Sequence, residues 1–286
     1  MNKTSTSQWY QVWVRFRKNK SAILGMVIFI LLVIIALISP MIYDYNTDIV
    51  TQNLRNRLQP PTSEHPLGTD AFGRDVFARI AYGARVSLLI GFIVVGASLV
   101  IGGFIGAIAG YFGGILDNVL MRIMDIFLAI PQILLAIAVV AALGPGITNL
   151  IIALTISMIP AYARLLRSLI LPLKDAEYVE AAKASGTNIW KIIFGHLLPN
   201  AMGPLIVNST LAVGKTIVSA AGMSFLGLGI SPPNPEWGAM LSEGKEYIRY
   251  APNLVLYPGM AIMLAVLSLN LLGDGLNDAL DPRLKQ

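Results

Sequence analysis

The chain has 286 residues, of which 55% are hydrophobic and 13% charged, with a net charge of +5 and a mean hydropathy of +0.68. Soluble domains carry roughly 25% charged residues, so this composition excludes an ordinary soluble protein and indicates an integral membrane protein. The basic residues are scattered, which excludes the basic, aromatic-rich face of a nucleic-acid-binding protein, and the absence of cysteine excludes disulfides and thiolate chemistry.

The first predicted span follows a polar, basic N-terminal tail. Its 23 residues, 21–43, carry no charge, and at about 1.5 Å per residue they can cross the ~30 Å hydrocarbon core of a bilayer. A signal peptide has a shorter apolar region that ends in a small-residue cleavage site. We therefore expect an uncleaved transmembrane helix, followed by a long polar loop over residues 44–85.

Uncharged runs predict five further spans. The second span is expected within residues 86–116. The run 126–163 is too long for one helix and is broken at Gly144–Gly146, where glycine and proline favour a turn, so it predicts a third and a fourth span joined by a hairpin. The fifth span is expected from Pro199 to about Gly222, and the sixth within residues 250–273. The sequence thus predicts an all-α polytopic membrane protein with six transmembrane helices.

Lysine and arginine residues set the expected orientation, because cytoplasmic segments carry an excess of them. If the N-terminal tail is cytoplasmic, six spans place the loop at residues 172–200 and the C-terminus on the same side. The inner segments then hold 13 Lys and Arg, against 7 outside. The outer loop runs against this trend, because it holds five arginines: Arg55, Arg57, Arg74, Arg79 and Arg85.

Three glycines in the second span lie four residues apart, at Gly102, Gly106 and Gly110. Because lipid tails give helices no hydrophobic reason to associate, close backbone approach at glycine is a common basis for packing in membranes. Their spacing places all three on one helical face. We expect this face to pack against another helix, which the sequence does not identify.

The motif Gly-Lys-Thr at Gly214–Thr216 suggests a nucleotide-binding loop but does not meet its requirements. A P-loop needs a glycine five residues before the Gly-Lys pair, and Ser209 stands there. The motif also lies within an apolar span. A lysine at that depth is costly, so Lys215 either faces a protein interior or water, as in a transport pathway, or snorkels to the surface.

No catalytic constellation is apparent, so we do not expect an enzyme. The two histidines, His65 and His196, lie in loops on opposite sides of the membrane. A self-sufficient secondary carrier would need intramembrane carboxylates or interrupted helices around a site. Pro131 and Pro160 interrupt the third and fourth spans, but no carboxylate accompanies them. A transporter of this kind must take its energy from a partner.

The loop at residues 172–200 contains a polar stretch, EYVEAAKASGTNIWKIIFGHLLPN, over residues 177–200. Asp175 can cap a helix at residues 176–185 that Gly186 ends in the left-handed conformation. A second helix is expected from Asn188 to Pro199.

Four residues share one face of the first helix by their spacing: Tyr178, Ala181, Ala182 and Ser185. Helices that rest on lipid headgroups prefer bulky apolar residues and many Lys or Arg. A face of small residues with one aromatic suits a protein groove better, so we favour a docking helix.

Several motifs together resemble one family. The Glu-Ala-Ala triplet at Glu180–Ala182, with Gly186 four residues later and Leu198–Pro199 beyond, resembles the EAA loop of bacterial ABC-importer permeases. His196 departs from the general motif, which has an apolar residue there, but the peptide branch often has histidine. HPLGTDAFGRDVFARIAYGARVSL at 65–88, FLGLGISPPNPEWGAML at 225–241 and GDGLNDALDPRLK at 273–285 are similar to the C-type permease of dipeptide, oligopeptide and nickel importers.

This resemblance implies a type I ABC importer permease fold with both termini cytoplasmic. Residues 1–84 would hold the tail, the first helix and the long extracytoplasmic loop. Residues 85–275 would form the five-helix transmembrane domain, with a cytoplasmic coupling loop at about 172–200. Residues 276–286 would form a cytoplasmic C-terminal tail.

The resemblance also implies partners and a function. The chain would lie in the lipid of a bacterial cell membrane as a multi-pass protein, paired with a B-type permease. Two ABC ATPase subunits would use the ATP, and an extracytoplasmic binding protein would deliver the cargo; the chain itself would bind no cofactor or metal. We expect uptake of di- or oligopeptides. The alternatives are uptake of nickel or another metal chelate and, in a different class, a self-sufficient carrier.

The residues implied for coupling to the ATPases are Tyr178, Glu180, Ala181, Ala182, Ser185 and Gly186. On the outer side, the proline-rich segment 231–249 is stiff because each proline fixes φ, and a binding protein could sit there. Glu236 and Trp237 open a short amphipathic piece within it. We consider Lys215, Glu236 and Trp237 for the transport pathway or an outer gate.

Overall fold

The computed structural model describes residues 8–280, and every regular element in that range is a helix. Five helices there are long and apolar enough to cross a membrane: α2 (Lys20–Ile42), α3 (Val76–Phe112), α6 (Ile147–Leu173), a helix over Ile189–Phe225 that contains α9 (Leu198–Phe225), and α11 (Asn253–Leu280). A sixth span results if α4 (Gly114–Leu128) and α5 (Gln132–Leu143), bent by 84° at their junction, form one broken span. The prediction of an all-α polytopic membrane protein is confirmed.

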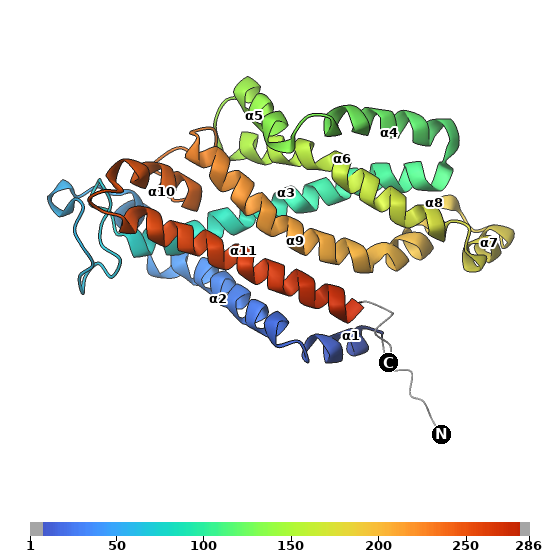
Figure 1. The fold of residues 1–286 in the computed structure, drawn as a ribbon, viewed down its shortest axis with the longest axis horizontal. Helices are drawn as coiled ribbons and strands as arrows, with labels where there is room; N and C mark the ends of the chain where they lie inside the picture. Colours follow the sequence, from blue (N-terminus) through green and yellow to red (C-terminus); the bar gives the residue numbers. More distant parts are fainter. Residues whose placement is uncertain (1–7, 281–286) are drawn as a thin grey trace.

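The shorter elements lie mostly at the two ends of the elongated bundle (Figure 1). They are α1 (Gln8–Phe16), a π-helical turn (Tyr45–Val50), a 3₁₀ turn (Leu54–Asn56), α7 (Glu177–Ala184), α8 (Ile189–Ile192), a second π-helical turn (Ile193–Leu197), α10 (Trp237–Gly244) and a 3₁₀ turn (Lys245–Tyr247). The loop between α2 and α3 lies with α10 at one end, and α7 lies at the other. α1 and the last turn of α11 point toward the α7 end.

α3 runs through the middle of the bundle and packs against α2, α6 and α9. The largest buried cluster gathers Ile90 and Val94 of α3, Leu154 of α6, Ile217 of α9 and Leu269 of α11. Because lipid is as apolar as these side chains, the cluster stabilises the bundle through close packing and not through removal from water.

α3 begins at Val76, ten residues before the uncharged run that starts at residue 86. The Asp75 carboxylate accepts the backbone N–H of Ala78 at 2.7 Å and caps the helix at its first turn. Arg79 and Arg85 then lie inside the helix. A boundary drawn at the last charge was wrong here, because the Arg79 charge is compensated by acidic side chains of other segments.

The third span is broken and differs most from expectation. Its first half, α4, contains Asp117 and Asp125, which the charge-free criterion excluded; Asp117 pairs with Arg167 and Asp125 with Arg164, both on α6. Pro131 then starts α5 in a new direction, because proline lacks an N–H and disfavours the helical conformation of the residue before it. Pro160, by contrast, lies inside α6 without breaking it.

Pro199 does not end a helix, so that expectation was wrong. α8, the π-helical turn and α9 form one continuous helix. The N–H of Leu198 donates to the carbonyl of Ile193, five residues back, and closes the π-helical turn. Pro199 comes just after this turn, where the wider π-helical register replaces the regular i→i−4 hydrogen bonds, and the helix continues past it.

The described part of the chain ends at Leu280, so residues 281–286 of the expected C-terminal tail, and residues 1–7 of the expected N-terminal tail, lie outside it. At the described ends, Phe16 of α1, Ala22 of α2 and Ala279 of α11 pack together. The N-terminal and C-terminal helices are thereby joined at the α7 end of the bundle.

Candidate functional site

α7 projects beyond the transmembrane helices at one end of the molecule (Figure 1). Its cap residue is Ala176, which makes no side-chain hydrogen bond, so the expected cap by Asp175 was wrong. Glu177 and Glu180 lie in the first turn instead, where negative charge interacts favourably with the helix dipole.

Gly186 ends α7 in the left-handed conformation, with φ of +72°. The N–H of Gly186 donates to Lys183 and that of Thr187 to Ala182, each at 3.0 Å, the pair of bonds that defines a Schellman motif. A side-chain carbon at Gly186 would meet no atom within 4 Å. Glycine is therefore required here by the backbone conformation and not by crowding.

The four residues expected on one face of α7 divide between two sides. Tyr178, Ala181 and Ser185 are exposed, with Tyr178 41% exposed, and Glu180 is exposed beside them. Ala182 is half-buried and packs against the chain itself.

Val179 anchors α7 to the bundle. It is fully buried in a cluster with Ile192, Ile193 and Leu197. The outward patch of α7 is therefore Tyr178, Glu180, Ala181 and Ser185, presented on a helix whose other side is held by Val179.

The three spaced glycines of α3 lie where α3 crosses α6. A side-chain carbon would overlap the carbonyl oxygen of Ile159 at Gly102 and that of Ala163 at Gly106. At Gly110 it would lie 3.1 Å from the side chain of Ile170. The structure thus brings the whole predicted face against one helix.

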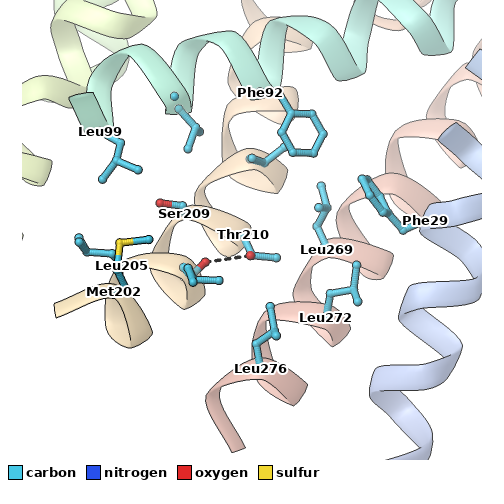
Figure 2. Close-up of a pocket in the computed structure, with 14 residues that line it drawn as sticks. Phe29, Phe92, Leu99, Met202, Leu205, Ser209, Thr210, Leu269, Leu272 and Leu276 are labelled. Atoms are coloured by element: carbon cyan, nitrogen blue, oxygen red, sulfur yellow. Dashed lines mark hydrogen bonds between the residues drawn. The ribbon is translucent and has the colours of Figure 1, made fainter. Parts of the chain in front are cut away.

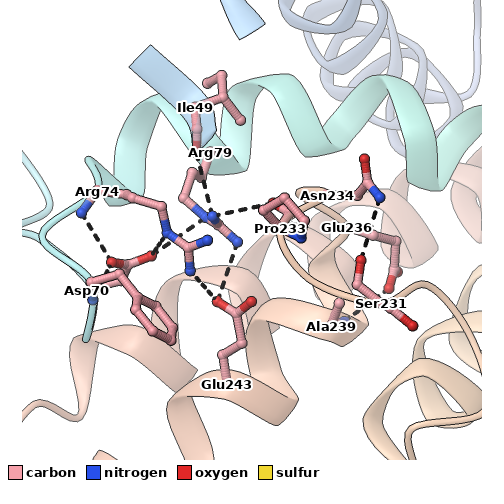
Figure 3. Close-up of polar contacts among 11 residues, drawn as sticks. Ile49, Asp70, Arg74, Arg79, Ser231, Pro233, Asn234, Glu236, Ala239 and Glu243 are labelled. Carbon is pink, nitrogen blue, oxygen red and sulfur yellow. Dashed lines mark hydrogen bonds and ion pairs between the residues drawn. The ribbon is translucent and has the colours of Figure 1, made fainter. Parts of the chain in front are cut away.

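Four charged residues form a buried network at the opposite end of the bundle (Figure 3). Arg74 pairs with Asp70 and with Glu243, each at 2.6 Å. Arg79, which is fully buried, contacts Glu243 at 3.2 Å and Asp70 at 3.6 Å. The network joins the outer loop, α3 and α10, and pairs two positive with two negative charges.

The charge pattern of the sequence does not predict this network. By sequence alone, Arg74 and Arg79 are positive charges of the outer loop that oppose the expected orientation. Because both are paired within the network, they weigh less against that orientation than free arginines. The available signal was an arginine within the apolar sequence VFARIAYG, since a buried arginine requires a carboxylate.

The outer loop is also held at its start. The Asp44 carboxylate accepts the backbone N–H groups of Thr47 and Asn46 at 3.0 and 2.9 Å, and these bonds hold the pKa of Asp44 below its ordinary value because they favour the ionised form. The Tyr45 hydroxyl donates to Asn234 at 2.6 Å. The loop is therefore tied to the proline-rich segment.

Glu236 and Trp237 do open a helix, α10, but their burial argues against a gate. The Glu236 carboxylate accepts the N–H groups of Gly238 and Ala239 at 2.9 and 2.8 Å. The Trp237 indole N–H donates to the carbonyl of Ile80 at 3.1 Å. Glu236 is 1% exposed and Trp237 0%, so within this chain both are packed anchors of α10.

A cavity of about 400 Å³ lies between α2, α3, α9 and α11 (Figure 2). Of its lining residues only Ser209 and Thr210 are polar, and the Thr210 hydroxyl donates to the Ile206 carbonyl at 2.8 Å. Such a lining offers little to a charged or polar cargo. Lys215 also lies on α9 but is exposed on another side.

No metal centre is apparent within residues 8–280, because no group of three or more His, Cys, Asp or Glu lies close enough to hold an ion.

Two family models match the chain. Residues 102–286 match the binding-protein-dependent transport system inner membrane component. Residues 7–61 match the N-terminal TM domain of oligopeptide transport permease C.

Similar proteins span almost the whole chain. The dipeptide transport system permease protein DppC of Alkalihalophilus pseudofirmus is 48% identical over 99% of this chain and 92% of its own length. The glutathione transport system permease protein GsiD of Pectobacterium atrosepticum is 43% identical over 99% and 94%. A solved structure of the MetNI methionine ABC transporter in an inward-facing conformation shares the fold, with a TM-score of 0.58 and 22% identity over 72% of this chain and 97% of that one.

Proposed function

Because the chain belongs to the binding-protein-dependent transport system inner membrane components, and is thus a non-enzymatic permease subunit of an ABC importer, we propose that it moves di- or oligopeptides into the cell. The relatives named above are permeases for dipeptides and glutathione, all short peptides. This favours peptides over a metal chelate as the cargo.

The proposed assembly has this chain beside a second, B-type permease, with two ATPase subunits and a binding protein. The outward patch of α7 is the proposed ATPase docking site. Its support is the projection of α7 from the bundle, its small exposed side chains and the capped end at Gly186. ATP is used by the ATPase subunits, and this chain binds no cofactor in the proposal.

The proposed orientation places α7 and both termini in the cytoplasm. The described ends of the chain lie toward α7, so α7 and both chain ends can lie on the same side of the membrane. The buried network and α10 then face outward, where the loop at 44–75 and the segment at 231–249 offer a surface to the binding protein.

The test is transport by the reconstituted complex. The two permeases and two ATPases, purified together and placed in liposomes, are supplied with the binding protein and ATP. We expect ATP-dependent accumulation of a labelled dipeptide or tripeptide, and none when a non-hydrolysable nucleotide replaces ATP. Accumulation of a nickel chelate without uptake of any peptide would contradict the proposal.

A further inference from the structure

Lys215 lies deep in the membrane-spanning region. It is ten residues before the end of α9 at Phe225, or about 15 Å at 1.5 Å per residue. The outer ends of α6 and α9 lie level, since the N–H of Gly146 donates to the carbonyl of Gly229 at 3.0 Å. A hydrocarbon core is ~30 Å thick, so Lys215 stands near its middle, too deep for an easy reach to either surface.

The Lys215 ammonium has no partner in the described part of the chain. No ion pair or side-chain hydrogen bond involves it there, and its side chain is exposed. A charged lysine against lipid at the bilayer centre is strongly disfavoured, and such residues normally face protein or water. Its exposed side therefore faces something polar in the assembled transporter.

Other polar residues share that side of α9. Asn208 is exposed seven residues before Lys215, and Ser219 is half-buried four residues after it, so the three follow one line along the helix. The apolar Val218 lies on the same side and is 49% exposed, whereas the side of α9 turned toward α3 and α6 is covered. Val213 packs on Gly91 of α3, and the Thr216 hydroxyl meets Met158 of α6 at 3.4 Å.

α11 continues the polar surface. The side-chain oxygen of Asn270 lies 3.8 Å from the position that a side-chain carbon at Gly214 would take. Asn270 is exposed, and so is Asp274 one turn further along α11. We call these five residues the polar face: Asn208, Lys215, Ser219, Asn270 and Asp274.

The contrast with the other side of the same two helices is sharp. There α9 and α11 present Leu205, Val213, Leu269 and Leu272 to the apolar cavity of Figure 2. α9 and α11 thus form a layer with an apolar side toward α3 and an uncovered side on which the polar face lies beside exposed apolar residues such as Val218 and Leu267.

We propose that the polar face lines the water-filled passage for cargo, and that Lys215 is its fixed positive charge, placed to bind the carboxylate of a passing peptide. This rests on the proposed peptide-import function. A lysine offers three hydrogen-bond donors and no acceptor, which matches a carboxylate. The side-chain amides of Asn208 and Asn270 can each donate hydrogen bonds to a peptide backbone and accept them from it. Because backbone groups are the same in every peptide, such bonds suit cargo of varied sequence.

Because the chain has no cysteine, single cysteines can report on water and charge at chosen positions. In the complete four-subunit transporter, with cysteine-free partners, Lys215→Cys and Asn270→Cys should react with hydrophilic methanethiosulfonate reagents. Leu31→Cys is the control, since Leu31 is 53% exposed in the middle of α2 with apolar neighbours, and it should not react. Labelling at position 215 as slow as at position 31 would overturn the proposal.

The charge is tested by comparing reagents of opposite sign. The ratio of the anionic to the cationic labelling rate at Asn270→Cys reports the local charge, to which Lys215 and the nearby Asp274 both contribute. Adding Lys215→Met should lower this ratio roughly tenfold, and adding Lys215→Arg should leave it unchanged. An unchanged ratio with methionine would mean that Lys215 does not set the potential of the passage.

Measurements of peptide uptake distinguish failure of this inference from failure of the proposed function. Lys215→Met should raise the KM for a labelled dipeptide roughly tenfold, with Lys215→Arg close to wild type. If the wild-type protein imports peptide and Lys215→Met has the same KM, Lys215 has no role in binding cargo and the proposed function stands. If wild type imports no peptide, the proposed function fails while the labelling still reports on the passage. Loss of the second permease from Lys215→Met would assign Lys215 to assembly and overturn the inference.

Discussion

Gly186 and Ala181 show how much of the proposed docking depends on single residues of α7. The first directs the backbone as it leaves the helix, and the second is part of the surface that a partner would meet. Neither contacts the transmembrane core, so both can be changed without disturbing the spans. Changes at these positions should therefore affect coupling selectively.

Gly186→Val should misdirect the chain after α7. A left-handed conformation costs an ordinary residue about 1–2 kcal/mol and more for a β-branched one. We expect insertion and pairing with the second permease to persist while co-purification of the ATPases and uptake fall. Gly186→Asn is the matched control, because asparagine tolerates this conformation. Wild-type coupling in Gly186→Val would show that the Schellman turn is dispensable.

Ala181→Trp should block docking of the ATPase subunits by adding bulk to the exposed surface of α7. The side chain is exposed, so tryptophan fits the isolated permease but overpacks a fitted interface, which typically costs ~1–3 kcal/mol. The measurement is ATPase co-purification alongside the thermal midpoint of the permease pair. Ala182→Trp is the contrasting variant: because Ala182 packs inward, it should lower the thermal midpoint itself. If Ala181→Trp binds the ATPases normally, this patch is not their docking site.

At the scale of elements, the glycine turns and the first span were predictable, whereas the cap of α7, the continuation of the helix past Pro199 and the compensated charges were not. The turn at Gly144–Gly146, the end of α7 at Gly186 and the first span all follow from glycine, proline and apolar length. α4 could not be delimited from charge-free runs, because Asp117 and Asp125 find arginines on α6, far away in sequence. The inward turn of Ala182 and the burial of Glu236 likewise depend on tertiary contacts that local spacing does not contain.

The crossing of α3 and α6 should fail if Gly106 gains a side chain. Gly106→Leu would place atoms where the Ala163 carbonyl now lies, and because that neighbour is backbone the two helices must separate. We expect loss of assembled protein and at least ~1–3 kcal/mol of stability. Ile93→Leu, at a position that is 42% exposed, is the control. Equal stability of the two variants, measured by thermal unfolding in detergent, would refute the role of this contact.

The buried network at the outer end should show strong coupling between its members. Arg79→Met leaves Glu243 and Asp70 with one cation fewer, and removing one partner of a buried ion pair typically costs ~3–5 kcal/mol. Arg79→Met combined with Glu243→Gln leaves the balanced pair of Arg74 and Asp70, so it should recover part of the loss. A double-mutant cycle on unfolding measures this. Additive losses would mean that the two side chains act independently.

At the scale of the whole molecule, the two ends of the bundle differ in character. One end carries α7 and the described chain ends, and the other carries the tied outer loop and α10 (Figure 1). The all-α membrane fold and the placing of both chain ends and α7 on one side were predicted from the sequence, whereas the direct packing of α1 and α2 against α11 at that end needed the structure. This arrangement gives a direct test of orientation.

A reporter fused after Gln286 tests whether the C-terminus is cytoplasmic. We expect activity from a reporter that folds inside the cell and none from one that requires export, with the reverse pattern for an insertion in the exposed outer loop after Glu64. Export-dependent activity after Gln286 would contradict the six-span orientation and place α7 outside, where no ATPase could reach it.

The unbroken helix from Ile189 to Phe225 has a mechanical consequence. At 37 residues and 1.5 Å per residue it is a rod of about 55 Å, and its last carbonyl accepts the Ser242 hydroxyl of α10 at 2.9 Å. A displacement beside α7 can therefore reach the outer end through one continuous helix, although this helix contains the π-helical turn and Pro204, whereas the path through α4 and α5 bends by 84°. The molecule thus has one continuous helix that joins its two ends and one span that is broken, and an importer must act at both ends together.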